Sequence, residues 1–208
     1  MTSRHQQLHT RIRETLIALG ADGDLVRQRH LPIHPEARCL SCVGTGSDGR
    51  DKFLTPATTA AWQAMQDAAR EQGVVLLLIS AFRSFDYQLA LIRGKLAKGR
   101  NIGEILAINA PPGCSEHHSG RAVDIGYPGM PPLEEDFETT PAFAWLQRFG
   151  ADFGFRLSYP RDNRHGYQYE PWHWCFQPQR RPRLTNRAAD DASGGSSSVQ
   201  SSGIPEKS

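Results

Sequence analysis

Two short segments carry side chains that together could bind a metal ion. The first, from Ser115 to Asp124, contains two adjacent histidines and ends in an aspartate, and the second, Glu170 to His173, adds a glutamate and a histidine. A catalytic zinc commonly takes three ligands from His, Asp or Glu and leaves its fourth position to water. Zinc lowers the pKa of that water to about 7 and polarises a carbonyl, as amide hydrolysis at neutral pH requires. These residue types therefore predict a zinc peptidase, with Glu170 placed to act as a base.

The seven-residue separation of His117 and Asp124 restricts how the first segment can fold. On one helix this spacing corresponds to about 10 Å of rise, which is too far for two side chains to share a metal easily. A turn at Gly120 followed by a strand over 121–125 would bring them together. Alternate residues of a half-buried strand point to opposite faces, so we expect Asp124 to face the site and its two neighbours to face the core.

The second segment is expected to be a strand over 172–176. On such a strand His173 points into the site, and the tryptophans on either side of it point away to pack. Glu170 has the wrong parity to share that face. Pro171 lies between them, however, and proline belongs at strand starts and bulges, where the side-chain direction can be reset.

The rest of the sequence predicts helices that alternate with short strands. Apolar residues at helical spacing and cap signals such as Thr-Pro predict helices at 3–19, 55–73, 84–96, 103–108 and 140–153. Further strands are expected at 74–80 and 155–159. We therefore predict an α+β fold, in which a small, central, mainly antiparallel sheet carries the zinc site and is flanked by helices.

The chain is expected to divide into three regions. Residues 1–53 would form an N-terminal helix and, from residue 21, an irregular connection rich in Pro, Gly and Asp. Residues 54–179 would form the catalytic domain. Residues 180–208 are Arg/Pro-rich and then Ser/Gly-rich with little to bury, so we expect a disordered tail.

The composition favours a globular protein without a nucleic-acid partner. The 208 residues are 38% hydrophobic and 22% charged, and the formal net charge is only +2. The sequence lacks an apolar run of the roughly 18 residues that a membrane span needs, and its start lacks the features of a secretory signal. From these features alone we expect a cytoplasmic chain. Without a signal the four cysteines are expected to be free thiols.

The two segments resemble the VanY-type D-alanyl-D-alanine carboxypeptidases, within the zinc peptidases that also include VanX dipeptidases and endolysin peptidases. The family pattern is Ser-x-His-x-x-Gly-x-Ala-x-Asp followed by Glu-x-Trp-His, and both parts are complete here. An upstream Ser-Gly-Tyr-Arg-Ser of the family corresponds to 80–84, where Ala81 and Phe82 replace Gly and Tyr. The resemblance covers about 54–176, and neither replacement affects the zinc ligands.

The resemblance implies roles for seven residues. Zinc would be held by His117, Asp124 and His173. Glu170 would be the general base and Arg83 would stabilise the oxyanion. Ser115 and Gln88 would contact the substrate, a peptidoglycan stem peptide or muropeptide. A substrate of this class would also be compatible with a location in the cell envelope. We expect one catalytic zinc ion and a monomer.

Several alternatives stay open. His118 competes with His117, but neighbours on an extended segment point to opposite faces, and the family register favours His117. We therefore expect His118 to be exposed, with a supporting role next to the metal ligands or a contact to substrate as the alternative. An endolysin-type endopeptidase or a non-catalytic zinc-containing wall-binding module would use the same fold. D,D-carboxypeptidase, L,D-carboxypeptidase and dipeptidase activities are equally compatible with the motifs.

A second, structural zinc site is a weaker possibility in the N-terminal region. It would use residues in a His-x3-His and a Cys-x2-Cys arrangement, namely His30, His34, Cys39 and Cys42. The prolines at 32 and 35 break any helix that would align the two histidines. Cys114 and Cys175 each lie within three residues of a proposed zinc ligand, so they could lie near each other.

Overall fold

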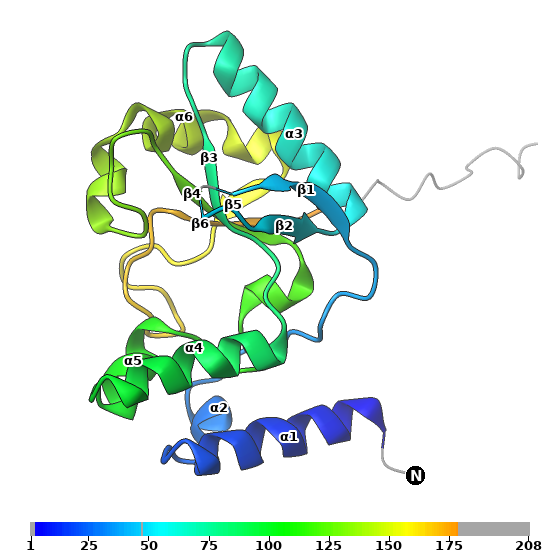
Figure 1. Cartoon of the computed structure of the whole chain (residues 1–208), viewed down its shortest axis with the longest axis vertical. Coiled ribbons are helices and arrows are strands. Elements are labelled where there is room, and N and C mark those ends of the chain that lie inside the picture. Colours follow the sequence, from blue (N-terminus) through cyan, green and yellow to red (C-terminus); the bar gives the residue numbers. More distant parts are fainter. Residues whose placement is uncertain (1–2, 47, 179–208) are drawn as a thin grey trace, which may run out of the picture. The chain divides into compact units, whose positions relative to one another are not determined.

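The structure, a computed structural model, describes residues 3–46 and 48–178. Its centre is a four-stranded antiparallel sheet in the order β3-β4-β6-β5 (Figure 1). The strands are β3 (Leu77–Ser80), β4 (Ala122–Gly126), β5 (Phe155–Leu157) and β6 (His173–Phe176). The predicted α+β fold with a mainly antiparallel sheet is confirmed, whereas the tail expected at 180–208 lies outside the described residues.

Two helices pack against one face of this sheet. They are α3 (Pro56–Glu71) and α6 (Pro141–Phe149), each with a threonine cap followed by proline, as expected from the sequence. Short 3-10 turns, η2 (Glu135–Thr139) and η3 (Gly150–Phe153), flank α6. The shared core is large and aromatic, and it includes Trp62, Met65, Val123, Ile125, Leu146, Phe155 and Trp174.

A second helical layer has its own apolar core. It contains α1 (Arg4–Ala18), α2 (Leu25–Gln28), α4 (Phe85–Ala97) and α5 (Ile102–Ile108). The buried residues of this core come from α1, α4 and α5, and they include Ile12, Leu16, Phe85, Ile92, Ile105 and Leu106. The N-terminal helix is therefore packed onto the helices that follow the sheet's first strand. Within the described residues, none of the helices combines the length and apolar character needed to cross a membrane.

A two-stranded hairpin replaces part of the irregular connection expected before residue 54. It pairs β1 (Ser41–Thr45) with β2 (Asp51–Leu54), with a register irregularity between Cys42 and Gly44. Most of its residues are exposed or half-buried, so the apolar alternation that reveals a strand is weak. The hairpin is tied to the site because Phe82 donates a backbone hydrogen bond to Phe53.

Strand β4 is more deeply buried than the sequence predicted. We expected it to be half-buried, but all five of its residues are buried, and β4 is an inner strand with β3 and β6 along its two edges. The expected alternation of side chains is nevertheless present. Val123 and Ile125 belong to the aromatic core, whereas Asp124 lines a cavity on the other face of the sheet.

Candidate active site

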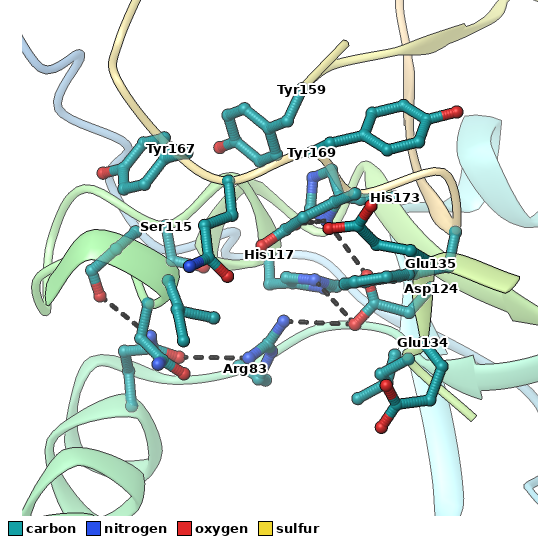
Figure 2. A pocket seen from close by; sticks show the side chains of 18 of the residues that line it. Arg83, Ser115, His117, Asp124, Glu134, Glu135, Tyr159, Tyr167, Tyr169 and His173 are labelled. Atoms are coloured by element: carbon teal, nitrogen blue, oxygen red, sulfur yellow. Dashed lines mark hydrogen bonds and ion pairs between the residues drawn. The ribbon is translucent and has the colours of Figure 1, made fainter. Parts of the chain in front are cut away.

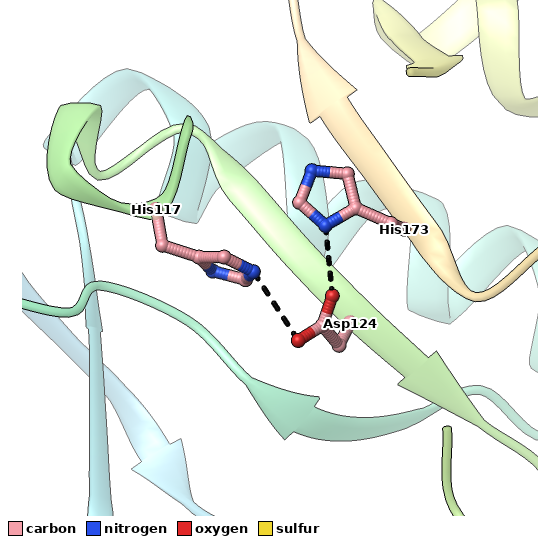
Figure 3. Close-up of side chains that lie close together, drawn as sticks. All are labelled: His117, Asp124 and His173. Atoms are coloured by element: carbon pink, nitrogen blue, oxygen red, sulfur yellow. Dashed lines mark hydrogen bonds and ion pairs between the residues drawn. The ribbon is translucent and has the colours of Figure 1, made fainter. Parts of the chain in front are cut away.

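The three predicted ligands come together through the sheet register and one tight turn (Figure 3). Asp124 of β4 pairs directly with His173 at the start of β6. His117 lies in the 3-10 turn η1 (Glu116–Ser119), which ends at Gly120 with φ of 64°. This left-handed conformation favours glycine. One candidate ligand atom from each of the three side chains lies within 4.8 Å of the others, and all three residues are buried.

His117 presents a free nitrogen to this cluster. Its Nδ1 donates a hydrogen bond of 2.6 Å to the carbonyl of Ala81, which can only accept, so the proton is on Nδ1. The other nitrogen, Nε2, is buried without a hydrogen-bond partner and lies 3.2 Å from Oδ2 of Asp124. Burial and the nearby Arg83 charge lower the pKa of His117 to about 4, so the ring is neutral at pH 7. Two acceptor atoms that face each other without a proton between them repel, and a cation bound by both would remove this repulsion.

His173 is held by carboxylates on both sides of its ring. Nδ1 lies 3.0 Å from Oδ1 of Asp124, and Nε2 lies 3.0 Å from Oε2 of Glu116. Burial disfavours the charged ring, but the bonds to Asp124 and Glu116 outweigh it and raise the pKa of His173 to about 10 without a metal. A tetrahedral zinc with bonds of about 2 Å holds its ligand atoms about 3 Å apart. The buried His₂Asp donor set therefore fits zinc.

Arg83 lies directly beside the cluster, in the loop between β3 and α4. Its guanidinium donates to Oδ2 of Asp124 and to the side-chain oxygen of Gln88, each at 3.3 Å. Gln88 is buried and donates its amide to the carbonyl of Ala110. Both ends of Gln88 are thus engaged, and it orients Arg83 in addition to lining the cavity.

Glu170 lies on the other side of the cluster. Its Oε2 is 3.7 Å from Nδ1 of His173, and burial raises the pKa of Glu170 to about 7. A turn in which the His173 amide donates to the Glu170 carbonyl reverses the chain at Pro171, so both side chains reach the same cavity. A carboxyl group with a pKa near the working pH is suited to accept and return a proton.

These residues line one cavity of about 420 Å³ (Figure 2). Its wall contains all seven residues predicted for the site: Arg83, Gln88, Ser115, His117, Asp124, Glu170 and His173. Other charged side chains of the wall are Lys95, Arg100, Glu134 and Glu135. Trp174 is buried in the core as expected, and Trp172, in the turn before β6, packs partly against that core while it also lines the cavity. The individual roles of the seven residues stay predictions.

His118 is buried rather than exposed, so the expectation of an exposed side chain is wrong. Its Nδ1 donates to the carbonyl of Arg83 at 2.6 Å, and its Nε2 accepts from the amide of Gly113 at 2.9 Å. The extended geometry assumed for this segment is in fact a 3-10 turn, in which neighbouring side chains can both point inward. His118 therefore ties the Arg83 loop to the loop before Ser115.

Glu116 could not be recognised as a site residue from its position in the sequence. It occupies the unspecified position of the Ser-x-His motif, and nothing in that pattern required a carboxylate. Only the fold shows that it lies against His173, 57 residues away in the chain.

The N-terminal His and Cys residues do not form a comparable cluster. Within residues 3–46 and 48–178, the His117–Asp124–His173 group is the one set of three donors close enough for a metal. Cys39 and Cys42 are exposed, Cys114 and Cys175 are buried, and all four are free.

The sequence matches a known family over most of its length. Residues 51–179 match the VanY family, described as D-alanyl-D-alanine carboxypeptidase. A D-alanyl-D-alanine carboxypeptidase of Enterococcus faecalis is 32% identical over 124 residues, which are 55% of this chain and 44% of that protein. The chain spans less than half of the length of several such curated relatives.

Solved structures share the fold. The LD-carboxypeptidase LdcB aligns with a TM-score of 0.61 and 28% identity, over 70% of this chain and 71% of that one. A vancomycin-resistance D,D-pentapeptidase VanY variant, solved in complex with Zn(II), aligns with a TM-score of 0.53 and 27% identity, over 69% and 82% of the two chains. The extent of the family match, together with this agreement in fold, shows that the chain belongs to the VanY family of D-alanyl-D-alanine carboxypeptidases.

Proposed function

We propose that the protein is a zinc-dependent carboxypeptidase that hydrolyses a D-alanyl bond of peptidoglycan stem peptides or their precursors. The observation that carries the proposal is the buried cluster of His117, Asp124 and His173, in which Nε2 of His117 has no hydrogen-bond partner. Unpaired buried polar atoms are rare in proteins and call for an explanation, and a bound cation supplies one here. The Zn(II) complex of a VanY relative supports the choice of metal.

The residues around the cluster suit peptide hydrolysis. Zinc bound there would activate water and polarise the substrate carbonyl. Glu170 would accept the proton of the attacking water at Oε2 and return it to the leaving amine. Arg83, which is already aimed at the cluster by Asp124 and Gln88, would stabilise the developing oxyanion.

The cations of the cavity favour a substrate with a free C-terminal carboxylate. Lys95 projects from α4 into the cavity and donates to the side-chain oxygen of Asn109 at 2.9 Å. Among the described residues, no carboxylate forms an ion pair with Lys95. Burial and the charges of Arg100 and Arg83 lower the pKa of Lys95. A half-buried cation without a counter-ion, next to other cations, is a place where an anionic end of a substrate would be stabilised, which supports an exopeptidase over an endopeptidase.

The test is D-alanine release from a panel of peptides by the zinc-loaded protein. The panel contains stem peptides ending in D-Ala-D-Ala, stem peptides ending in D-Ala after an L-centre, free D-Ala-D-Ala, and the C-terminal amide of the first peptide. We expect release from a free-acid peptide and much slower cleavage of the amide. Equal cleavage of acid and amide would favour an endopeptidase, and no release with one equivalent of zinc bound would refute the proposal.

A variant of Lys95 tests the carboxylate argument separately. Lys95→Met should raise KM for the free acid about 10- to 150-fold, because a hydrogen bond to a charged group contributes about 1.5–3 kcal/mol. It should change the KM for the amide little. Lys98→Met, on an exposed residue at the end of the same helix, is the matched control. Equal effects of Lys95→Met on acid and amide would show that Lys95 does not bind the carboxylate.

A further inference from the structure

Glu116 contacts the proposed metal ligand His173 from outside the cavity. Its Oε2 lies 3.0 Å from Nε2 of His173, and the hydroxyl of Ser158 donates to the same oxygen at 2.5 Å. The Glu116 side chain is 20% exposed, and it does not line the cavity that contains the cluster. The ring nitrogen that Glu116 contacts is the one that faces away from Asp124.

The backbone holds both ends of this contact in place. Glu116 directly precedes His117 in η1, so a single turn supplies one proposed ligand and the carboxylate that touches another. Ser158 follows β5, and its amide donates to the carbonyl of His173. The ring of Tyr159 packs against the His173 ring, with 4.8 Å between the centroids. The orientation of the His173 ring is thus fixed on several sides.

We propose that Glu116 is a positioning residue for the metal, acting through His173 and held by Ser158. As a carboxylate it can only accept, so it keeps a proton on Nε2 of His173 and leaves Nδ1 to bind a cation beside Asp124. Metal-ligating histidines commonly donate their second N–H to a carboxylate, which fixes the tautomer and raises the basicity of the ligand. This inference rests on the proposed function, because it assumes that the cluster binds zinc.

The geometry argues against two simpler roles for Glu116. It is not a fourth ligand, because it contacts the nitrogen on the side of the ring opposite to the Asp124 contact. It is also more than a surface ion pair, because the His173 and Asp124 side chains are each only 4% exposed. A buried imidazole whose two nitrogens face two different carboxylates is held in one orientation.

The test is zinc affinity, measured by competition with a chelator of known affinity for wild type, Glu116→Ala, Glu116→Gln and Ser158→Ala. Losing a carboxylate that orients a metal-binding histidine costs about 10–100-fold in affinity. We expect that loss for Glu116→Ala, and a smaller loss for Glu116→Gln, which keeps an acceptor oxygen, and for Ser158→Ala. The visible spectrum of the cobalt-substituted protein should also change in the Glu116 variants. Glu134→Gln removes a carboxylate from the cavity wall without touching a ligand, and its zinc affinity should equal that of wild type.

The outcomes separate this inference from the proposed function. If wild type binds no zinc, the proposed function fails. If wild type binds zinc and both Glu116 variants bind it equally tightly, with unchanged cobalt spectra, only the role of Glu116 is refuted. If Glu116→Ala does not fold by circular dichroism, Glu116→Gln and Ser158→Ala still decide, because each keeps a side chain of nearly the same size or removes only a hydroxyl.

Discussion

Whether a histidine at this site can bind a metal depends on whether one of its ring nitrogens is free of hydrogen bonds. His117 and His118 are neighbours and both are buried, yet they have different hydrogen-bond partners. His118 has both ring nitrogens bonded to backbone groups, so it has no lone pair left for a metal. His117 has one nitrogen bonded and one free. Chain position alone does not separate the two residues, whereas their hydrogen bonds do.

The proposed oxyanion role of Arg83 predicts a loss of activity when its charge is removed. Arg83→Ala should lower kcat for D-alanine release about 100-fold or more, because preorganised charge at a developing oxyanion is commonly worth 10²–10³ in kcat. The measurement is steady-state kinetics with the best peptide of the panel, at one equivalent of bound zinc. Arg93→Ala, on an exposed position of the following helix α4, is the control and should leave kcat unchanged. Activity of Arg83→Ala within twofold of wild type would exclude the oxyanion role.

The different burial of the four cysteines predicts that they react differently with an alkylating reagent. Burial raises the pKa of Cys114 to about 12 and shifts the pKa of Cys175 in the same direction, so both stay thiols at pH 8. The thiolate is the reactive form, and Cys39 and Cys42 are the exposed pair. Iodoacetamide at pH 8 should therefore add two groups to the native protein and four to the denatured protein, as counted by mass spectrometry. Rapid labelling of Cys114 in the native protein would contradict this burial.

The residues that sequence reasoning found are those in fixed motifs. The spacing of His117, Gly120 and Asp124 already implied a turn followed by a strand, which the structure has as η1 and β4. Glu116 could not be found in this way, because its partner His173 is reached only through the pairing of β4 with β6. The burial of His118 was missed because the conformation of four residues, a 3-10 turn rather than an extended segment, decides it.

The cap signals in the sequence predicted where the helices begin. The sequence pattern was less successful for the burial of β4 and for the β1–β2 hairpin. Ser3, Thr55, Ser84 and Thr140 cap the helices that the sequence placed after them. Local hydrogen bonds set these boundaries, so local sequence is sufficient to predict them. The burial of β4 depends instead on its central place in the sheet, and the hairpin β1–β2 depends on pairing between weakly patterned strands. Both features depend on contacts between strands, which the local sequence pattern does not reveal.

The packing of α1 against α4 and α5 predicts that a buried residue of α1 contributes to the free energy of unfolding. Leu16 is fully buried between α1 and the helices α4 and α5. Leu16→Ala should lower the free energy of unfolding by about 2–5 kcal/mol, as large-to-small changes in a packed core do. Urea unfolding followed by tryptophan fluorescence measures it, with Ile17→Ala, on a residue 53% exposed, as the control. An unchanged midpoint for Leu16→Ala would mean that α1 is not part of the cooperative unit.

The candidate site lies between two layers of the fold, each of which has its own apolar core. The sheet with α3 and α6 carries Asp124 and His173, and the cavity wall on the other side includes Gln88 and Lys95 of α4. The loops that join the layers carry Arg83, His117 and Glu170. The fold therefore holds the candidate metal ligands, the proposed base and a cation on different elements around one cavity.

We propose that Glu170 acts as the base beside a zinc ion held by His117, Asp124 and His173. The most direct test is D-alanine release by wild type and Glu170→Ala, each with its zinc content measured in the same sample. We expect about one zinc per chain in both proteins and a loss of turnover of roughly 10²–10⁴-fold in Glu170→Ala, the usual contribution of a general base. Unchanged turnover in Glu170→Ala with zinc bound would contradict this proposal.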